Sequence, residues 1–275
     1  MVDNLHMDAT ASLDETRTLF DLAPHAMEQN VILGLSNLHM DCLSTFLMPK
    51  PHHPGQFESL GTGFFVYWPE TPDIVRLVTA AHVIENFDFE YGRITVGNMR
   101  IALGNVGQKN PDKIRDTLVW SIPSSHFIRR NITNVPTLPF WEPDLAKTNL
   151  IPTQSFMIMG YPASKNKALD FRYGKEPSRN VTAMAIHVPP MLSEQGVLQF
   201  AYSGKGVNEA WAGGSRTSPY LKGMSGSPCL RIISDRATGK IGVVLAGVFT
   251  EWDKSGHYLS VGWFGDPWLV PTSPQ

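Results

Sequence analysis

The feature that most constrains this chain is a series of short apolar or alternating segments that begins at Leu43 and ends at Trp263. The segments are rich in Val, Ile, Phe, Thr and Tyr and are separated by Gly, Pro, Asn and Asp, which is typical of β-strands joined by turns. No helical periodicity recurs between them, so an alternating βαβ sheet is excluded and barrels or sandwiches are favoured. The expected strands are Leu43–Met48, Gly61–Trp68, Ile74–Thr79, Arg93–Val96, Met99–Leu103, Thr117–Ile122, Phe156–Met159, Val181–His187, Val197–Tyr202, Leu230–Ile233, Ile241–Thr250 and Tyr258–Trp263.

The first 41 residues have a different character, and we interpret them as a helical N-terminal arm. Apolar residues recur there at three- and four-residue steps, and Ser12 followed by Glu15 forms a capping-box pattern. Pro24 is expected to break or kink the segment. Among the strands, the segments Gly104–Asp112 and Ser203–Pro219 are expected loops because they are rich in Gly and polar residues.

Charge and cysteine content exclude several classes of protein. Lys and Arg number 23 against 25 Asp and Glu, a net charge of −2, and no basic stripe is visible, so a nucleic-acid surface is not expected. No segment approaches the apolar length of a membrane span, and the N-terminus lacks the pattern of a secretory signal. The two cysteines are too few for a disulfide framework. We therefore expect a cytoplasmic protein with neither membrane nor nucleic-acid partner.

Motifs for a metal or a cofactor are weak. His52 and His53 are adjacent, so on an extended chain they point to opposite faces, and no carboxylate or cysteine stands at ligand spacing. The glycine-rich segment that begins at Ser203 lacks the spacing of a phosphate-binding loop. Neither a metal nor a cofactor is expected.

The heptad from Lys222 to Pro228, Lys-Gly-Met-Ser-Gly-Ser-Pro, is the first segment with chemical potential. Ser225 between two glycines can sit at the tip of a tight turn whose backbone N–H groups face one point. Such an arrangement suits a nucleophile next to an oxyanion hole. By composition alone the heptad could equally be an ordinary turn between two strands.

A second informative segment, Leu-Val-Thr-Ala-Ala-His, runs from Leu77 to His82. An apolar strand ends in small residues and places a histidine where the chain turns. The glycine-flanked strand that begins Gly61-Thr62-Gly63 is able to lie close to that turn. A histidine after an apolar segment is often structural, so its significance depends on the serine turn.

Together, Leu77–His82 and Gly223–Pro228 resemble the trypsin/chymotrypsin-like (clan PA) serine proteases, most nearly the disulfide-free bacterial HtrA-like branch. The two motifs occur in the family's order, His before Ser. The resemblance covers residues 42 to 263 and implies two antiparallel six-stranded β-barrels with the active site between them. It implies a peptidase domain over residues 42–275, with a first barrel to about residue 145 and a second barrel after it.

A histidine base needs a partner that fixes its tautomer, a role that serine proteases give to an aspartate. Asp116 fits best because it begins an apolar strand after His82, as the family's aspartate does. Asp144 has a closer local match, Asp-Leu-Ala, but leaves little chain before the second barrel. Asp112 would serve if the turn were displaced. The third member is therefore left open among Asp116, Asp144 and Asp112.

The resemblance implies a mechanism in which Ser225 attacks a peptide carbonyl, His82 moves the proton, and the N–H groups of Gly223 and Ser225 form the oxyanion hole. Met224 departs from the animal digestive enzymes, which have an aspartate there and are armed by a freed N-terminus. A methionine cannot form that ion pair. The site is therefore expected to be preformed or controlled by a partner.

Substrate recognition is expected from residues around the strand that follows the serine. Thr250, Glu251 and Trp252 resemble the part of the family's strand that borders the primary pocket, and Pro219 stands about where trypsin has its basic-selecting aspartate. Nothing at Pro219 demands a basic residue. Glu251 is either a charge that favours a basic or polar substrate residue or an exposed charge at a strand end.

The sequence thus predicts a serine endopeptidase that acts on a protein or peptide. A regulatory protein partner could bind the N-terminal arm, as in bacterial defence or regulated proteolysis. The alternative is a catalytically silent protease-like domain that serves as a binding or scaffolding module. The presence of histidine, aspartate and serine candidates favours the enzyme.

Overall fold

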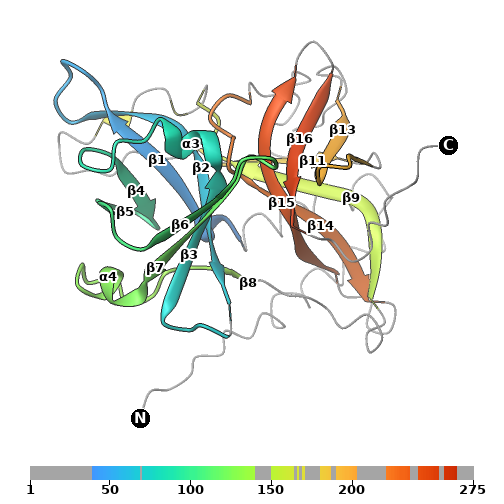
Figure 1. Ribbon diagram of the computed structural model, residues 1–275, viewed down its shortest axis with the longest axis horizontal. Coiled ribbons are helices and arrows are strands. Elements are labelled where there is room, and N and C mark those ends of the chain that lie inside the picture. Colours follow the sequence, from blue (N-terminus) through green and yellow to red (C-terminus); the bar gives the residue numbers. More distant parts are fainter. Residues whose placement is uncertain are drawn as a thin grey trace.

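The computed structural model describes residues 39–68, 70–139, 150–163, 166, 169–170, 180–186, 190–202, 221–235, 241–253 and 257–264. Two β-sheets lie side by side in this part of the chain, the first built mainly from the N-terminal half and the second from the C-terminal half (Figure 1). The helical elements described are short, and they are η2 (Met40–Cys42), α3 (Ala81–Glu85) and α4 (Ser124–Ile128).

The first sheet has nine strands along the order β5-β4-β1-β2-β3-β7-β6, with β10 and β8 paired to β2 outside this path. Its neighbours are antiparallel except for β8, which lies parallel to β2. The strands are β1 (Leu43–Pro49), β2 (Gln56–Tyr67), β3 (Ile74–Ala80), β4 (Arg93–Val96), β5 (Met99–Ile101), β6 (Gln108–Asp112), β7 (Thr117–Pro123), β8 (Leu138–Pro139) and β10 (Leu169–Asp170).

The second sheet has seven strands in the order β11-β9-β14-β15-β16-β13-β12, all antiparallel. The long strand β15 lies at its centre between β14 and β16 (Figure 1). The strands are β9 (Leu150–Gly160), β11 (Thr182–Ile186), β12 (Met191–Leu192), β13 (Val197–Ala201), β14 (Pro228–Asp235), β15 (Ile241–Asp253) and β16 (Tyr258–Trp263).

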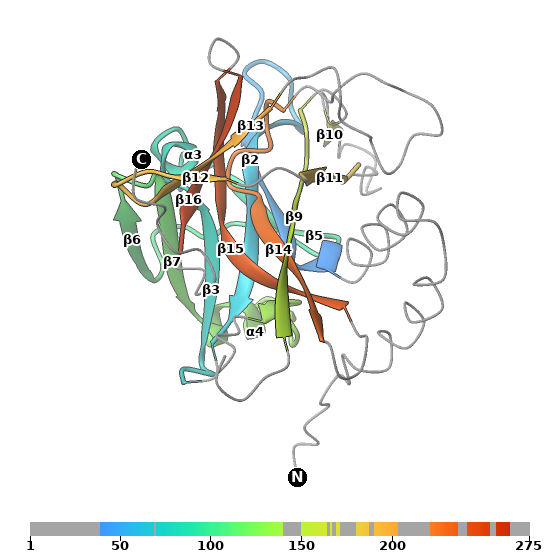
Figure 2. The same cartoon turned by 90° about the vertical axis from the view of Figure 1, so that its right-hand side faces the viewer.

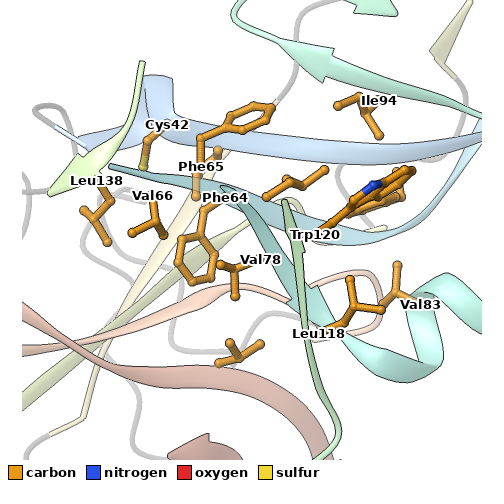
Figure 3. Close-up of a cluster of buried hydrophobic side chains, with 14 of the residues drawn as sticks. Cys42, Phe64, Phe65, Val66, Val78, Val83, Ile94, Leu118, Trp120 and Leu138 are labelled. Atoms are coloured by element: carbon orange, nitrogen blue, oxygen red, sulfur yellow. The ribbon is translucent and has the colours of Figure 1, made fainter. Parts of the chain in front are cut away.

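The core of the first sheet continues into the second. Phe64, Phe65 and Trp120 are fully buried, and Figure 3 shows these rings with Val78 and Leu118 in one cluster. The same cluster contains second-sheet side chains, namely Met157, Met159, Leu230 and Val248. Burial of one large apolar side chain contributes about 1.5–3 kcal/mol. The shared core therefore fixes the two sheets relative to each other.

The sheets also approach each other closely at a glycine. A Cβ on Gly262 of β16 would collide with the carbonyl oxygen of Arg115 and the methyl group of Thr117, so this position has room only for glycine. Figure 2 shows β7 and β3 of the first sheet beside β16 and β15 of the second. The turn between β6 and β7 is thus held against the second sheet.

The prediction of a mainly β chain with two β units is confirmed, and each of the expected strands corresponds to a strand of the structure. Six-stranded barrels were expected, whereas the described sheets have nine and seven strands. The expectation that Gly104–Asp112 is only a loop is wrong, because its second half forms β6. The sequence Gln-Lys-Asn-Pro-Asp lacks apolar residues because β6 is an edge strand with largely exposed side chains. Within the described residues, the first and last strands in the order of each sheet do not pair with each other.

Some expectations fall on segments about which the structure says nothing. Residues 1–38 of the expected helical arm and the barrel boundary near residue 145 lie outside the described residues. Cys42 and Cys229 are both buried and form no disulfide, and Cys229 packs as a small apolar side chain in the second core cluster. None of the helices described is long and apolar enough to cross a membrane.

Candidate active site

His82 lies in the first turn of the short helix α3, directly after β3. The first N–H groups of a helix have no partner within it. Here the carbonyl oxygen of Asp116 accepts from Ala81 N at 3.0 Å, and its carboxylate oxygen Oδ1 accepts from His82 N at 3.0 Å. Asp116 therefore caps the helix that carries His82, because the methyl side chain of Ala80 at the N-cap cannot accept a hydrogen bond.

The second carboxylate oxygen of Asp116 binds the His82 ring. Oδ2 lies 2.6 Å from Nδ1, and the two side chains are 34% and 42% exposed. A carboxylate only accepts hydrogen bonds, so the proton of the neutral imidazole is assigned to Nδ1. The lone pair of Nε2 then faces away from Asp116 and is available to take a proton.

Asp116 reaches this position through an unusual backbone conformation. Its φ is +52°, in the left-handed region that Asp and Asn tolerate better than other non-glycine residues. The turn that contains it is closed by the pairing of Asp112 with Thr117. Such strain persists only where the surroundings enforce it, and it often marks a functional site.

Asp112 has a different role in the same turn. Its Oδ1 accepts from Ile114 N at 3.0 Å and from Arg115 N at 3.1 Å, an arrangement in which an aspartate stabilises its own turn. Its other oxygen lies 3.6 Å from Arg115 Nε. Of the three candidate aspartates, the structure brings Asp116 to His82 and uses Asp112 in the turn. Asp144 lies outside the described residues.

Arg115, which the sequence did not single out, ties this turn to the second sheet. Its Nη1 donates to the carbonyl oxygen of Trp263 at 3.3 Å. A Cβ on Gly196 would lie 2.9 Å from Arg115 Nε, so the side chain also lies against the turn before β13. The position of Asp116 therefore depends on contacts with both sheets.

The serine turn precedes β14 in the second sheet. Gly223 and Gly226 both have φ of +90°, which favours glycine. A Cβ on Gly226 would collide with the carbonyl oxygen of Thr62 and the hydroxyl of Thr79. The prediction that Gly223 requires glycine for its backbone conformation agrees with this φ. Ser225 at the tip is partly exposed, whereas Met224 before it is fully buried in the second core cluster.

Three N–H groups of the serine turn donate hydrogen bonds to backbone carbonyl oxygens. Met224 N donates to Leu221 O at 3.0 Å, Gly226 N to Phe249 O at 2.7 Å, and Ser227 N to Met224 O at 2.9 Å. Within the part of the chain that the structure describes, the N–H groups of Gly223 and Ser225 have no acceptor. Two unpaired donors beside a partly exposed serine hydroxyl can bind an anionic oxygen.

Strand β2 lies between the serine turn and the histidine. Thr62 N donates to the Ser225 carbonyl oxygen at 2.8 Å, and Thr79 Oγ1, three residues before His82, donates to Thr62 O at 2.7 Å. A Cβ on Gly61 would lie 2.6 Å from Cγ2 of Val83 and 2.9 Å from the Ser225 carbonyl oxygen. Ser225 and the residue after His82 therefore meet at one point of β2. Between the side chains of Ser225 and His82 themselves there is no hydrogen bond.

The residues expected to recognise substrate lie on β15, just beyond its contact with the serine turn. Phe249 N donates to Ser227 O at 2.8 Å. Thr250 is 4% exposed and its hydroxyl donates to Ser260 O at 3.2 Å, so it is held within the sheet. Glu251 is exposed, and Trp252 packs edge-on against Tyr202 with ring centroids 5.8 Å apart. Pro219 lies outside the described residues.

Carboxylates determine the electrostatics of His82. The hydrogen bond that His82 donates to Asp116 raises the pKa of His82 above its ordinary value of 6.5, burial lowers it, and the charges of Asp116, Glu251 and Glu85 raise it further, with a net upward shift. The effects of Glu251 and Glu85 were not expected from the sequence, because they depend on the approach of β15 and on the last turn of α3. The imidazolium form is therefore stabilised.

Comparison with known proteins gives only distant matches. No family model and no curated protein matches the chain. Among solved structures, the serine endoprotease from Yersinia pestis matches with 14% identity and a TM-score of 0.43 over 86% of this chain and 62% of its own. Tobacco etch virus protease in complex with product matches with 12% identity and a TM-score of 0.41 over 83% of this chain and 75% of its own.

A Glu endopeptidase matches with 14% identity and a TM-score of 0.37 over 81% of this chain and 84% of its own. All three proteins are proteases by name, the class that the histidine and serine motifs resemble. The chain spans less than two thirds of the Yersinia pestis enzyme. TM-scores below 0.5 are too low to transfer a function, which has to be argued from the residues of this chain.

Proposed function

We propose that the protein is a serine endopeptidase in which Ser225 is the nucleophile, His82 the general base and Asp116 the residue that orients His82. The observation that carries the proposal is the pair of N–H groups in the serine turn, on Gly223 and Ser225, that have no acceptor among the described residues. They accompany a partly exposed hydroxyl, and strand β2 contacts both this turn and the residue after His82. One strand thus connects the candidates for nucleophile, base and oxyanion donors.

In the proposed reaction, Ser225 Oγ attacks the carbonyl carbon of a peptide bond while Nε2 of His82 takes the hydroxyl proton. The carbonyl oxygen becomes an oxyanion that accepts hydrogen bonds from the N–H groups of Gly223 and Ser225. The intermediate collapses, the C–N bond breaks, and His82 gives the proton to the leaving amine. Water, deprotonated by His82, then hydrolyses the ester on Ser225. A Ser225–His82 hydrogen bond is required at the attack step and often tightens only when substrate binds.

A polypeptide substrate is supported by the part of β15 that follows its contact with the serine turn. Up to Val248 the strand pairs with β14, and Phe249 is bonded to the serine turn. Glu251 pairs with Ser260 of β16, and its side chain is exposed. An extended peptide can bind along an exposed strand through backbone hydrogen bonds. The scissile bond would then lie close to Ser225.

The burial of Met224 supports a site that is not activated by a newly cleaved N-terminus. Its side chain is fully buried among apolar residues of the second core, where it has no means to bind an ammonium group. The proposed regulatory partner for residues 1–41 has no support in the described residues, and the same holds for a cytoplasmic location. Both stay predictions.

Labelling with a fluorophosphonate tests the proposed function without knowledge of the substrate. The full chain is expected to react once, and mass spectrometry of the labelled peptide should place the phosphonyl group on Ser225. Ser227 is the internal control, because it belongs to the same turn but is 0% exposed. A chain that does not react, or that reacts elsewhere, would instead indicate the catalytically silent binding module.

The rate of this labelling should depend on pH through His82. Only the neutral imidazole can accept the Ser225 proton, and the pKa of His82 is raised above 6.5. Reactivity should therefore be lost as the pH falls through this raised pKa, at a higher pH than for an ordinary histidine. Because the Glu85 charge contributes to the shift, Glu85→Gln should move the midpoint to lower pH. A rate independent of pH between 5 and 9 would contradict His82 as the base.

A further inference from the structure

Thr62 of β2 contacts the serine turn with its side chain as well as with its backbone. Its hydroxyl donates to the carbonyl oxygen of Gly223 at 2.9 Å and accepts from the N–H of Tyr161 at 3.0 Å. The residue is 0% exposed, so both hydrogen bonds are shielded from solvent. One hydroxyl of the first sheet thus joins the serine turn to the residue that follows β9.

The segment after β9 in turn fixes the direction of an oxyanion donor. Ala163 N donates to the carbonyl oxygen of Lys222 at 2.6 Å. A trans peptide unit is planar, so its C=O and N–H groups point in opposite directions. The bond to Lys222 therefore directs the N–H of Gly223 away from Ala163. A Cβ on Gly223 would lie 2.8 Å from Ala163 N and 3.0 Å from Tyr161 O, so the turn lies directly against this segment.

The next peptide unit of the turn is held at both of its polar groups. The carbonyl oxygen of Gly223 accepts from the Thr62 hydroxyl, and Met224 N donates to Leu221 O at 3.0 Å. The side chain of Met224 is buried among apolar residues and carries no charge that could hold the turn. Hydrogen bonds from neighbouring segments therefore fix the peptide units on both sides of Gly223.

We propose that Thr62 is a positioning residue that holds the oxyanion hole in its binding conformation before substrate arrives. The proposal rests on the proposed peptidase function and adds a residue that acts through Gly223 without touching substrate. Without the hydroxyl, the Gly223 carbonyl would lose its donor and Tyr161 N its acceptor. The glycine would then be free to change its backbone conformation, and its N–H would spend part of the time turned away from the oxyanion.

The test compares Thr62→Val, which removes the hydroxyl but keeps the shape, with Thr62→Ser, which keeps the hydroxyl. Valine leaves the backbone bonds of this position to Ser225 and Thr79 in place. Thr62→Val should react with a fluorophosphonate about tenfold more slowly, a smaller loss than the about 10²–10³ expected when a whole oxyanion donor is removed. Thr62→Ser should restore most of the rate. The pH midpoint should not move, because the bond between His82 and Asp116 is untouched.

Thr45→Val is the matched control. Thr45 pairs with Thr62 between β1 and β2, is also 0% exposed, and has a hydroxyl without a hydrogen-bond partner among the described residues. Its labelling rate should equal that of the parent. Equal rates in the parent and Thr62→Val, an equal loss in both valine variants, or failure of Thr62→Ser to restore the rate would overturn the inference and leave the peptidase proposal intact. A parent chain that resists fluorophosphonate would overturn the peptidase proposal, and the inference with it.

Hydrogen exchange of the parent chain, followed by NMR, tests the inference even if Thr62→Val does not fold. The amides of Tyr161 and Ala163 should be protected before any reagent is added, because the oxyanion hole is already in place. Exchange at Gly223 should be fast at first and slow by about tenfold or more once Ser225 carries the phosphonyl group. Protection of Tyr161 and Ala163 that appeared only after labelling would show that the hole forms on binding, and the inference would be wrong.

Discussion

Replacement of Ser225 by alanine is expected to lower kcat for protein hydrolysis by about 10⁶-fold, the size of effect seen when a serine nucleophile is removed from such a catalytic unit. The variant keeps the two glycines that give the turn its shape, and alanine adds no bulk at the tip. Its fold should therefore be unchanged. The measurement is the release of fluorescent peptides from a labelled unfolded protein, with circular dichroism to check that both proteins are equally folded.

Ser227→Ala is the matched control for this experiment. Ser227 is two residues from Ser225, fully buried, and has no hydrogen-bond partner for its hydroxyl among the described residues. Its hydroxyl lies against Gly160, where a Cβ would collide with it. Loss of this oxygen should change kcat by less than about threefold. If Ser225→Ala retained activity while Ser227→Ala lost it, the assignment of the nucleophile would be wrong.

The sequence was informative about strands because the two sheets share one core. The second half of β2 and most of β14 are buried on both faces, so their apolar residues run in succession and not at alternate positions. Strand β6 escaped prediction because it is a polar edge strand that contains Pro111. Strand β10 joins the first sheet from the C-terminal half, and local sequence carries no signal for such a distant pairing.

The serine turn and the histidine were predictable because each depends on local chemistry. Glycines with positive φ on both sides of a serine are recognisable in sequence, as is a strand that ends in small residues before a histidine. The contacts that bring them together were harder to predict. They run through Thr62 and Gly61 of β2, which meet the serine turn from far away in sequence.

The sequence left three candidates for the aspartate that orients His82, because the choice among them depends on the register of the β6–β7 hairpin. The pairing of Asp112 with Thr117 leaves Asp116 at the end of the turn, where a positive φ turns it toward His82. A shift of one residue would reverse the facing of every side chain. Arg115 of this hairpin bonds to the Trp263 carbonyl oxygen in the second sheet, a contact that cannot be read from the hairpin alone.

Asp116→Asn is expected to slow phosphonylation of Ser225 by about 10⁴-fold with little loss of folding. Asparagine has the shape of aspartate and tolerates a φ of +52°, so the turn can persist. The amide oxygen can still accept from His82 N, which places the NH₂ group against Nδ1. Nδ1 must then accept a hydrogen bond from the amide, so the ring proton moves to Nε2. His82 can no longer take the Ser225 proton.

The tautomer of the His82 ring can be measured directly. It would not change if Asp116 had only a structural role. ¹⁵N NMR of the parent chain should show neutral His82 protonated at Nδ1, and Asp116→Asn should show it protonated at Nε2. Asp112→Asn is the matched control in the same turn, since asparagine can still accept from Ile114 N and Arg115 N. Only an exposed ion pair with Arg115 is lost, so its rate should stay within about threefold of the parent. If Asp144→Asn lost activity while Asp116→Asn kept it, Asp144 would be the orienting residue, and Asp116 would serve only to cap α3.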